Sequence, residues 1–386
     1  MKRKVYCLMG AAFVLVCGCG KTQDTSVDMQ KATAAEYQEA DNLADEFEIQ
    51  SVNLPIKEEN LGFYCVSDGK IFYVVDYSDS LQDQTGTGEN VEFENKYNTQ
   101  IHMYDMNQKE DQLVYQYDLD YCMSIYDLRA RGDRIVWIEQ PKSGGWIMKT
   151  MDTGDEIQPQ SITDSTEMSS DENDAVVPTM SEDKAYWYQC KKEKKHSYSL
   201  YSYDFLTQKI QCEQTDLDVE SPYEGFSLVS SVGTLLEKEN DVHSLIHLWN
   251  VKNAKKAQLH IDGEVSAPIS NESLSVWMKN YETDGTLYIY DWDAAEIGKI
   301  DFNPGRFFSY GIIGDNVFVN QRDQSAYGSD GLICFDVKKK EYQQIMETDQ
   351  MLTIFQGDDD EIYTSVVEDG VVTIITVTMR DEKSGA

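Results

Sequence analysis

Long hydrophobic runs, basic residues and paired cysteines are scarce in this sequence. The apolar stretch from Val5 to Gly18 is shorter than the ~20 apolar residues that a membrane-crossing helix needs. Only 33 Lys and Arg residues stand against 69 Asp and Glu, which gives the chain a formal net charge of −36. Because such an acidic surface repels nucleic acid, we expect no nucleic-acid partner.

The cysteine spacing offers neither a metal site nor a disulfide framework. Beyond the N-terminal stretch, five cysteines stand singly in strand-like segments, and no CxxC occurs: Cys65, Cys122, Cys190, Cys212 and Cys334. Metal sites and disulfide frameworks show paired or repeated spacings. We therefore expect no metal or other cofactor and interpret these cysteines as small buried hydrophobic residues.

Catalytic motifs are also missing. No HExxH, GxSxG or P-loop sequence occurs. His102 and His247 occupy the same place in two repeated segments, "IHMY" and "IHLW", which favours a structural role. The acidic cluster "GDDDE" (357–361) resembles the repeated turn "SDGK", so we interpret it as a turn rather than a calcium site. These observations favour a non-enzymatic protein and leave catalysis undecided.

The N-terminus has the features of an export signal. Basic residues at positions 2–4 precede the apolar stretch, and this order is typical of a secretory signal peptide. The stretch ends in "VCGC" (16–19), which resembles a bacterial lipobox, where a small residue precedes the cut and a cysteine follows it. An ordinary signal peptide with two incidental cysteines is the alternative.

The lipobox predicts which residue carries lipid. Gly18 is the small residue before Cys19, whereas Val16 precedes Cys17. We therefore expect residues 1–18 to be removed as a signal peptide and Cys19 to be the lipidated first residue of the mature protein. Two acyl chains on Cys19 would hold the protein stably on the membrane, at its extracytoplasmic face.

Residues 19–45 are expected to form a polar tether. The segment "GKTQDTSVDMQKATAAEYQEADNLAD" (20–45) is rich in Ala and Glu and has no apolar period. Such a composition buries too little apolar surface to order itself. One marginal helix over Met29–Leu43 is the most structure that we expect there.

One pattern recurs seven times after the tether. Each copy has a polar turn followed by an alternating apolar strand. The copies are "SDGKIFYVV" (67–75), "ARGDRIVWI" (130–138), "SEDKAYWYQ" (181–189), "SSVGTLLEK" (230–238), "SNESLSVWM" (270–278), "IGDNVFVNQ" (313–321) and "GDDDEIYTS" (357–365). A second strand follows, and it ends in Asp or Asn in five copies. These residues are Asp105, Asp204, Asn250, Asp291 and Asp336.

Four strands per copy predict a β-propeller. A strand precedes each turn, and a further strand follows in most copies, so we name the four strands A to D in chain order. Repeats of ~40–50 residues with four short strands are typical of propeller blades. We therefore predict an all-β, seven-bladed β-propeller with four-stranded blades over residues 46–380, followed by a C-terminal tail at 381–386.

The seventh copy needs a strand from elsewhere. It ends after its C strand near Met379, and an open ring would leave bare sheet edges. The strand-like segment "EFEIQSVNL" (46–54) precedes the first A strand. We expect this N-terminal strand to become the D strand of blade 7 and so to close the ring.

The seven copies resemble the TolB-like and YWTD-like propeller families. The resemblance rests on the turn-and-strand pattern of "SDGKIFYVV" and on strands that end in Tyr-Asp, as in "IHMYDMN". It implies the propeller architecture over residues 46–380. It implies no functional residues, because the YWTD tetrad is missing from every copy.

The long loops are expected on one face. In a four-stranded blade, the D–A and B–C connections share one face, and the A–B and C–D turns share the other. The long connections at 77–99, 161–176 and 322–331 are all of the first kind, as is the basic "KKEKKH" (191–196). Because long loops on a rigid scaffold tend to carry function, we expect partners to bind there.

These observations predict a membrane-anchored lipoprotein that acts as a binding or scaffolding module at the cell envelope. Its partner would be an envelope protein or a glycan, and a sensor that displays its propeller to membrane proteins is a related possibility. The alternative is a carbohydrate-binding or carbohydrate-active protein that uses the loop-rich face. Exposed Tyr or Trp at the channel mouth would favour the carbohydrate alternative, and an apolar patch on a rim or blade edge would favour the scaffold.

Overall fold

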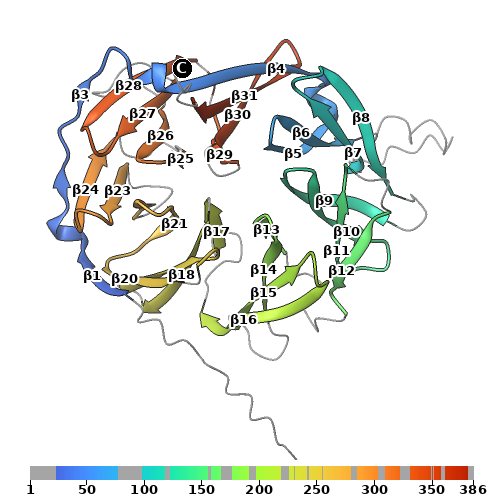
Figure 1. The fold of residues 1–386 in the computed structure, drawn as a ribbon, viewed down its shortest axis with the longest axis horizontal. Helices are drawn as coiled ribbons and strands as arrows, with labels where there is room; N and C mark the ends of the chain where they lie inside the picture. Colours follow the sequence, from blue (N-terminus) through green and yellow to red (C-terminus); the bar gives the residue numbers. More distant parts are fainter. Residues whose placement is uncertain are drawn as a thin grey trace, which may run out of the picture.

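The computed structural model describes residues 23–380, except 77–97, 118–121, 155–157, 167–175, 191–196, 219–225, 230, 241–242, 254, 280–284, 303–308, 322–330, 349, 351 and 358–360. Within this part of the chain, nearly all regular structure is strand. Seven sheets surround a common axis (Figure 1). The prediction of an all-β, seven-bladed propeller is confirmed.

Each blade has four antiparallel strands, with strand A nearest the axis. Blades 1 to 3 consist of β5 (Leu61–Ser67), β6 (Lys70–Asp76), β7 (Asn98–Asp105) and β8 (Glu110–Gln116); β9 (Cys122–Arg131), β10 (Arg134–Pro141), β11 (Ile147–Asp152) and β12 (Gln160–Asp164); and β13 (Thr179–Met180), β14 (Lys184–Cys190), β15 (Ser197–Asp204) and β16 (Lys209–Asp218).

Blades 4 to 7 continue the same order. They consist of β17 (Phe226–Val229), β18 (Val232–Asn240), β19 (His243–Asn250) and β20 (Lys256–Asp262); β21 (Ser266–Ser270), β22 (Leu274–Met278), β23 (Thr286–Asp291) and β24 (Glu296–Asp301); β25 (Tyr310–Ile313), β26 (Asn316–Gln321), β27 (Gly331–Asp336) and β28 (Glu341–Glu347); and β29 (Phe355–Gln356), β30 (Glu361–Glu368), β31 (Val371–Met379) and β4 (Phe47–Lys57).

The Asp and Asn residues that end the C strands build the C–D turns. Oδ1 of Asp291 accepts the backbone N–H groups of Asp293 and Ala294, each at 2.9 Å. Ala295 then takes a positive φ of 53°, and the chain reverses without a glycine. The next strand begins at Glu296. The acidic cluster "DWDAAE" (291–296) is therefore a capped turn.

The A–B and C–D turns of a blade are joined by hydrogen bonds. In blade 5 the backbone N–H of Trp292 donates to the carbonyl of Ser273 at 3.0 Å, and in blade 4 that of Val251 donates to Ser231 at 2.8 Å. Turns of neighbouring blades also meet, as where the Asn271 side chain donates to the carbonyl of Gly314 at 2.7 Å. We call the face that these turns form the turn face, and the face of the D–A and B–C connections the loop face.

The N-terminal strand closes the ring as predicted. Strand β4 pairs antiparallel with β31, from Phe47 opposite Met379 to Lys57 opposite Val371. It thereby becomes the D strand of blade 7, and the chain continues directly into β5 of blade 1. The first and last blades are thus held together by one continuous segment.

The prediction of a polar tether over residues 19–45 is wrong from Gln23 onward, where the chain is ordered. It forms β1 (Gln23–Asp28), β2 (Thr33–Ala34) and β3 (Gln38–Glu39), each parallel to the outer strand of a blade. The marginal helix is absent, since the remaining turns are the short 3-10 segments η1 (Met29–Lys31) and η2 (Leu43–Glu46). We call residues 23–46 the strap; Figure 1 shows it along the outside of blades 4 to 6.

Main-chain pairing explains why a polar segment is ordered here. The D strands of blades 4 to 6 would otherwise present unpaired N–H and C=O groups at the outer edge. The strap satisfies these groups and needs few apolar side chains to do so. Its buried anchors are Val27, Met29 and Leu43.

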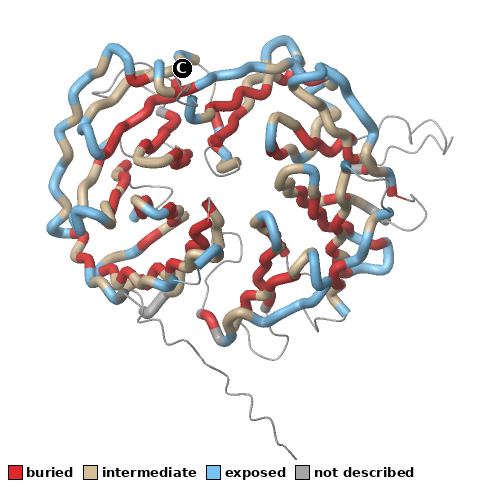
Figure 2. Tube along the Cα trace, in the orientation of Figure 1, coloured by how far each residue is buried: buried red, intermediate tan, exposed pale blue. Residues whose placement is uncertain are grey.

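The core lies within and between the blades. Figure 2 shows buried residues concentrated in the inner strands, with exposed residues along the outer rim and the strap. Trp137, Trp187 and Trp277 occupy equivalent places in the B strands, and each is at most 1% exposed. These tryptophans are therefore packing residues of the core.

The cysteines agree only in part with the sequence interpretation. Cys65 and Cys334 are buried, whereas Cys212 is exposed on the outer strand of blade 3, so its interpretation as buried is wrong. The side chains of Cys122 and Cys190 lie outside the described residues. In the described part of the chain, no helix has the length and hydrophobicity to cross a membrane.

Candidate functional site

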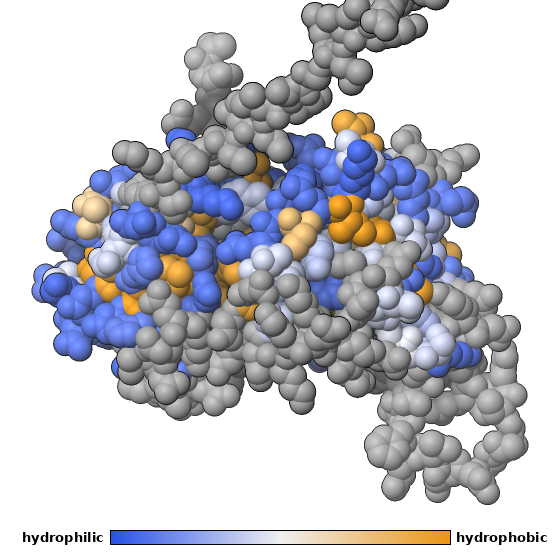
Figure 3. Space-filling model, turned by 90° about the horizontal axis from the view of Figure 1, so that it is seen from below, coloured by the Kyte–Doolittle hydropathy of each residue, from blue (hydrophilic) through white to orange (hydrophobic). Residues whose placement is uncertain are grey.

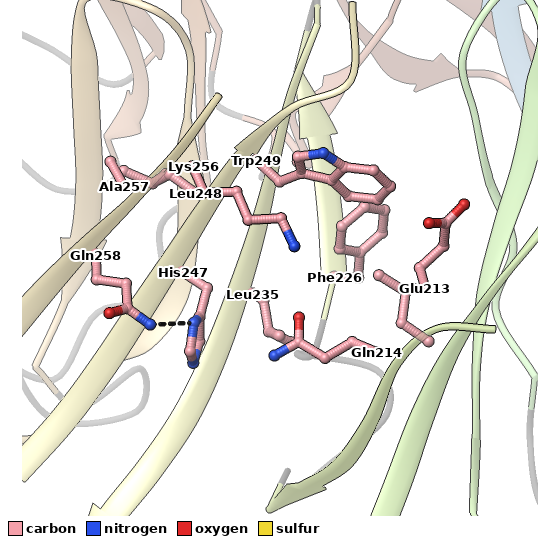
Figure 4. Close-up of a pocket in the computed structure, with 12 residues that line it drawn as sticks. Glu213, Gln214, Phe226, Leu235, His247, Leu248, Trp249, Lys256, Ala257 and Gln258 are labelled. Carbon is pink, nitrogen blue, oxygen red and sulfur yellow. Dashed lines mark hydrogen bonds between the residues drawn. The ribbon is translucent and has the colours of Figure 1, made fainter. Parts of the chain in front are cut away.

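A cleft of about 180 Å³ lies between blades 3 and 4. Figure 4 shows Glu213 and Gln214 entering it from β16, opposite Trp249 and Lys256 from the outer half of blade 4. Each blade contributes one wall, so the cleft exists only because the two sheets are set side by side.

An aromatic wall forms one side of the cleft. Side chains alternate along a strand, so His247 and Trp249 on β19 face blade 3, while Ile246 and Leu248 join the core toward blade 5. Behind Trp249, the ring of Tyr186 meets the indole edge-on, with centroids 5.7 Å apart and an interplanar angle of 86°. This pair holds the indole in place.

Phe226 extends the aromatic wall, and a glycine makes room for it. A Cβ at position 233 would lie 2.8 Å from two ring atoms of Phe226. Gly233 therefore lets the ring lie against β18. In Figure 4 the rings of Phe226 and Trp249 lie next to each other.

Charged side chains lie on both sides of the cleft. The Glu213 carboxylate accepts a hydrogen bond from the Ser202 hydroxyl at 2.6 Å and lies 3.3 Å from the ammonium of Lys184. The Lys256 ammonium lies 5.7 Å from the Trp249 ring centroid, within cation–π range. The cleft therefore combines an aromatic surface with fixed charges of both signs.

His247 is held at both ring nitrogens. Its Nε2 lies 2.6 Å from a carboxylate oxygen of Glu237, and the Gln258 amide lies 3.0 Å from Nδ1 (Figure 4). The Glu237 carboxylate can only accept, so Nε2 is the donor in that contact. His102 in blade 1 is held similarly, by Asp111 at 3.0 Å and Gln100 at 3.2 Å. The structural role expected of the two histidines stays a prediction.

The tyrosines behind the cleft stay neutral. The pKa of Tyr186 is raised to about 12, mainly by burial; a hydrogen bond with Ser181 acts in the opposite direction, and the Glu213 carboxylate contributes to the rise. Burial also raises the pKa of Tyr188, and the Glu237 carboxylate adds to this shift. At neutral pH both phenols therefore serve as packed, uncharged side chains.

This arrangement is suited to binding a small group. Ligand pockets for whole small molecules measure about 300–1,000 Å³, so this cleft fits a portion of a ligand, such as one sugar ring or one amino-acid side chain. Among the described residues that line it, His247 and Glu213 are each engaged by partners that fix their orientation. Because neighbouring side chains already use these polar atoms, His247 and Glu213 are better suited to binding a ligand than to transferring a proton to or from it.

The other predicted sites are covered by the structure only in part. Cys19, most of the three long connections, "KKEKKH" (191–196) and Asp358–Asp360 lie outside the described residues. Within the described ranges, no group of three or more His, Cys, Asp or Glu residues is placed to hold a metal ion. Sequence reasoning missed the cleft, because its walls come from separate repeats.

Two phenylalanines mark a second surface, near the axis. Phe63 on β5 is 44% exposed and Phe355 on β29 is 38% exposed. They belong to the innermost strands of neighbouring blades, and the ring centroid of Tyr64, the residue after Phe63, lies 5.7 Å from that of Phe355. No described Tyr or Trp is classed as exposed. Within the described ranges, the choice between a scaffold and a carbohydrate-binding protein stays a prediction.

Comparison with known proteins identifies the fold. No protein-family model matches the chain, and no curated protein matches it. The β-propeller domain of the Trilobed protease from Pyrococcus furiosus, described as having an open velcro topology, gives a TM-score of 0.52 at 12% identity, over 79% of this chain and 90% of that one. Acylaminoacyl peptidase from Pyrococcus horikoshii gives a TM-score of 0.52 at 13% identity, over 79% of this chain and 49% of that chain.

At these identities the likeness shows the fold alone. The chain spans about half of the acylaminoacyl peptidase, so the activity of that protein is not carried over. The pairing of β4 with β31 distinguishes this ring from one that is described as open. The predicted relationship to the TolB-like and YWTD-like families stays a prediction.

Proposed function

We propose that this chain is a membrane-anchored extracytoplasmic lipoprotein whose propeller is a non-enzymatic binding or scaffolding module at the cell envelope. The anchoring rests on the sequence, where Gly18 and Cys19 complete a lipobox after a basic and apolar segment. The repeat pattern also supports a TolB-like relationship. In this proposal the propeller is the working part and the lipid on Cys19 determines where it works.

The binding role is supported by one observation: the polar side chains of the cleft already form hydrogen bonds or ion pairs with their neighbours. The Glu213 carboxylate is used by Ser202 and Lys184, and both nitrogens of His247 are used by neighbours. A general base needs a free acceptor directed at the substrate. A rigid aromatic wall with fixed polar groups is instead what a recognition site needs.

A glycan-binding role is the second candidate. The Trp249 indole, with the Gln214 amide and the Glu213 carboxylate opposite, offers an apolar surface and polar groups within one cleft. This composition can accept a sugar ring as well as a protein side chain. The loop face could contribute further contacts in either case.

Envelope binding can separate the two candidates. A chain that starts at Gln23 would be mixed with cell envelopes of the producing bacterium, either untreated, protease-treated or lysozyme-treated. We expect binding that protease abolishes and that Trp249→Ala weakens by about tenfold or more, as for a buried aromatic anchor. Trp292→Ala is the matched control, because Trp292 donates to Ser275 outside the cleft.

The outcomes have distinct meanings. Binding that survives protease but is lost after lysozyme would establish the glycan candidate instead. If Trp249→Ala and Trp292→Ala weakened envelope binding equally, the cleft would not be part of the binding surface. The melting temperature of each variant shows whether the fold has survived.

A further inference from the structure

The outer edge of β16 borders the cleft, and among the described strands none pairs with it. We propose that an extended, non-acidic segment of a partner protein pairs with this edge and places an aromatic side chain in the cleft between blades 3 and 4. Addition of a strand to a sheet edge is a recurring mode of peptide recognition. The inference rests on the binding role of the proposed function and names the form of the partner.

The strap shows that the outer edges of this propeller accept an added strand. β1 pairs with β20 over six residues, from Gln23 opposite Ala257 to Asp28 opposite Asp262. β2 and β3 add to the edges of blades 5 and 6 in the same way. Main-chain hydrogen bonds supply affinity in such pairings, whatever the side chains. β16 belongs to the blade before the one where the strap begins, and it is left without such a strand in the described part of the chain.

The middle of β16 lacks the features that protect other open edges. Native edge strands are kept from pairing by shortness, charge or proline. In blade 2 the outer strand β12 has only five residues, in blade 1 β8 begins with Glu110 and Asp111, and in blade 7 β4 contains Pro55. β16 has ten residues, and its stretch 210–212 carries neither a charge nor a proline. Figure 3 views the rim from the side of blades 3 and 4, where separate hydrophobic areas interrupt a hydrophilic surface.

An added strand would meet a different surface on each face of the blade 3 sheet. Gln214 lines the cleft on the side of blade 4 (Figure 4). Ile210 and Cys212 stand opposite two residues of β15 that pack toward blade 2, Tyr203 and Tyr201. Ile210 is 39% exposed, and Cys212 is exposed as well. Because side chains alternate along a strand, one set would reach the cleft and the other would cover Ile210 and Cys212.

The cleft is open to such a side chain from the outer rim. β16 and β20, the outermost propeller strands of blades 3 and 4, both line it. Phe226 and Trp249 line it from strands nearer the axis. Glu213 and Lys256 carry opposite charges on its two sides, so neither sign of charge is favoured inside. An aromatic ring instead gains contact with the two aromatic side chains.

Charge determines which kind of segment can approach. The chain carries a formal charge of −36, so a second copy or an acidic segment is repelled. Four carboxylates and two lysines lie along the turn-face half of β16 and in the turns beside it: Glu182, Asp183, Asp204 and Glu213, with Lys184 and Lys209. The local balance is therefore also acidic. We expect basic residues next to the aromatic one in the bound segment.

Peptide selection tests the edge directly. Random peptides displayed on phage would be selected on the mature full-length protein in detergent, and the selected peptides would be synthesised. We expect them to share an aromatic residue with basic neighbours. A bound peptide should slow alkylation of the exposed Cys212 thiol at least about threefold, because it covers this face of β16. Unchanged alkylation of Cys212, or a selection that yields no binding peptide, would overturn the inference.

Methylation of the peptide backbone distinguishes strand pairing from binding through side chains. In a paired strand, every second amide faces the partner. Methylation of those amides should weaken binding by about tenfold or more, and methylation of the amides between them should leave it within about twofold. A peptide that tolerates methylation at every amide would contradict strand addition.

Three variants locate the site on the propeller. Ile210→Lys and Trp249→Ala should each weaken peptide binding by about fivefold or more. Leu113→Lys is the matched control for the first, since Leu113 is 48% exposed on the outer strand of blade 1. The two lysine variants should have the same melting temperature. Equal weakening by Leu113→Lys and Ile210→Lys would mean that β16 is not the site.

Failure of this inference can be told from failure of the proposed function. If protease abolishes envelope binding and Trp249→Ala weakens it, but Ile210→Lys leaves it unchanged, the binding role stands and the edge inference falls. If peptides bind at β16 with the expected alternation but the protein binds no envelope component, the envelope role falls and the edge inference stands.

Discussion

Replacing Phe47 with alanine should strongly destabilise the whole propeller. Phe47 begins β4, is 1% exposed, and meets the ring of Phe318 edge-on at 5.0 Å. It therefore joins the strand that closes blade 7 to the B strand of blade 6. Truncating a fully buried Phe to Ala costs about 3–5 kcal/mol, which is a large share of a typical stability of about 5–15 kcal/mol.

Denaturation in guanidinium chloride can measure this loss, with the buried tryptophans as reporters. With a slope of ~6 kcal/mol/M or more for a domain of this size, we expect the midpoint to fall by about half a molar. Ile49→Ala is the matched control, because Ile49 is 40% exposed two residues further along the same strand. Its free energy of unfolding should change by less than about 1 kcal/mol.

One result would refute this reasoning. If Phe47→Ala and Ile49→Ala had the same small effect, β4 would not be part of the cooperative ring. Leu43→Ala extends the test to the strap, since Leu43 is 1% exposed and packs in the same cluster as Phe47 and Phe318. A loss of about 2–5 kcal/mol is expected there, whereas a flexible tether would show none.

Two further predictions concern the cleft and the tyrosines. Gly233→Ala should cost about 1–3 kcal/mol, because its Cβ would displace the Phe226 ring. The loss should shrink in the Phe226→Leu background, and independent effects in a double-mutant cycle would contradict the contact. Stability should also fall as the pH rises above 10: burial raises the pKa of Tyr186 to about 12 in the folded state, whereas an exposed tyrosine in the unfolded chain ionises near 10. Absorbance of phenolate together with unfolding would check this, and full ionisation of the folded protein near pH 10 would contradict it.

The repeated parts of the fold were predictable because each copy carries its own local signal. The alternation in "SDGKIFYVV" marks a strand, and Asp291 marks a turn because its side chain replaces a backbone hydrogen-bond partner. The closing strand was predictable from the missing strand of the last copy. In each case the pattern of residues in the sequence agrees with a general requirement of the fold, such as a paired strand edge or a closed ring.

The strap and the cleft could not be predicted in this way. The sequence around Val27 has no period, because β1 is held mainly by main-chain pairing with β20. The cleft depends on the packing of Trp249 against Tyr186 from another repeat. Cys212 lies on an outer strand, where alternating apolar and polar residues in the sequence do not imply that the apolar side is buried.

The mass of the N-terminal peptide of the membrane-purified protein tests the central claim most directly. We predict a tryptic peptide that begins at Cys19, ends at Lys21 and carries a diacylglyceryl group, and we predict that Cys19→Ala leaves the protein unprocessed or free of the membrane. A mature N-terminus at another residue, with Cys19 unmodified or removed, would contradict the claim that this propeller is a lipid-anchored module of the cell envelope.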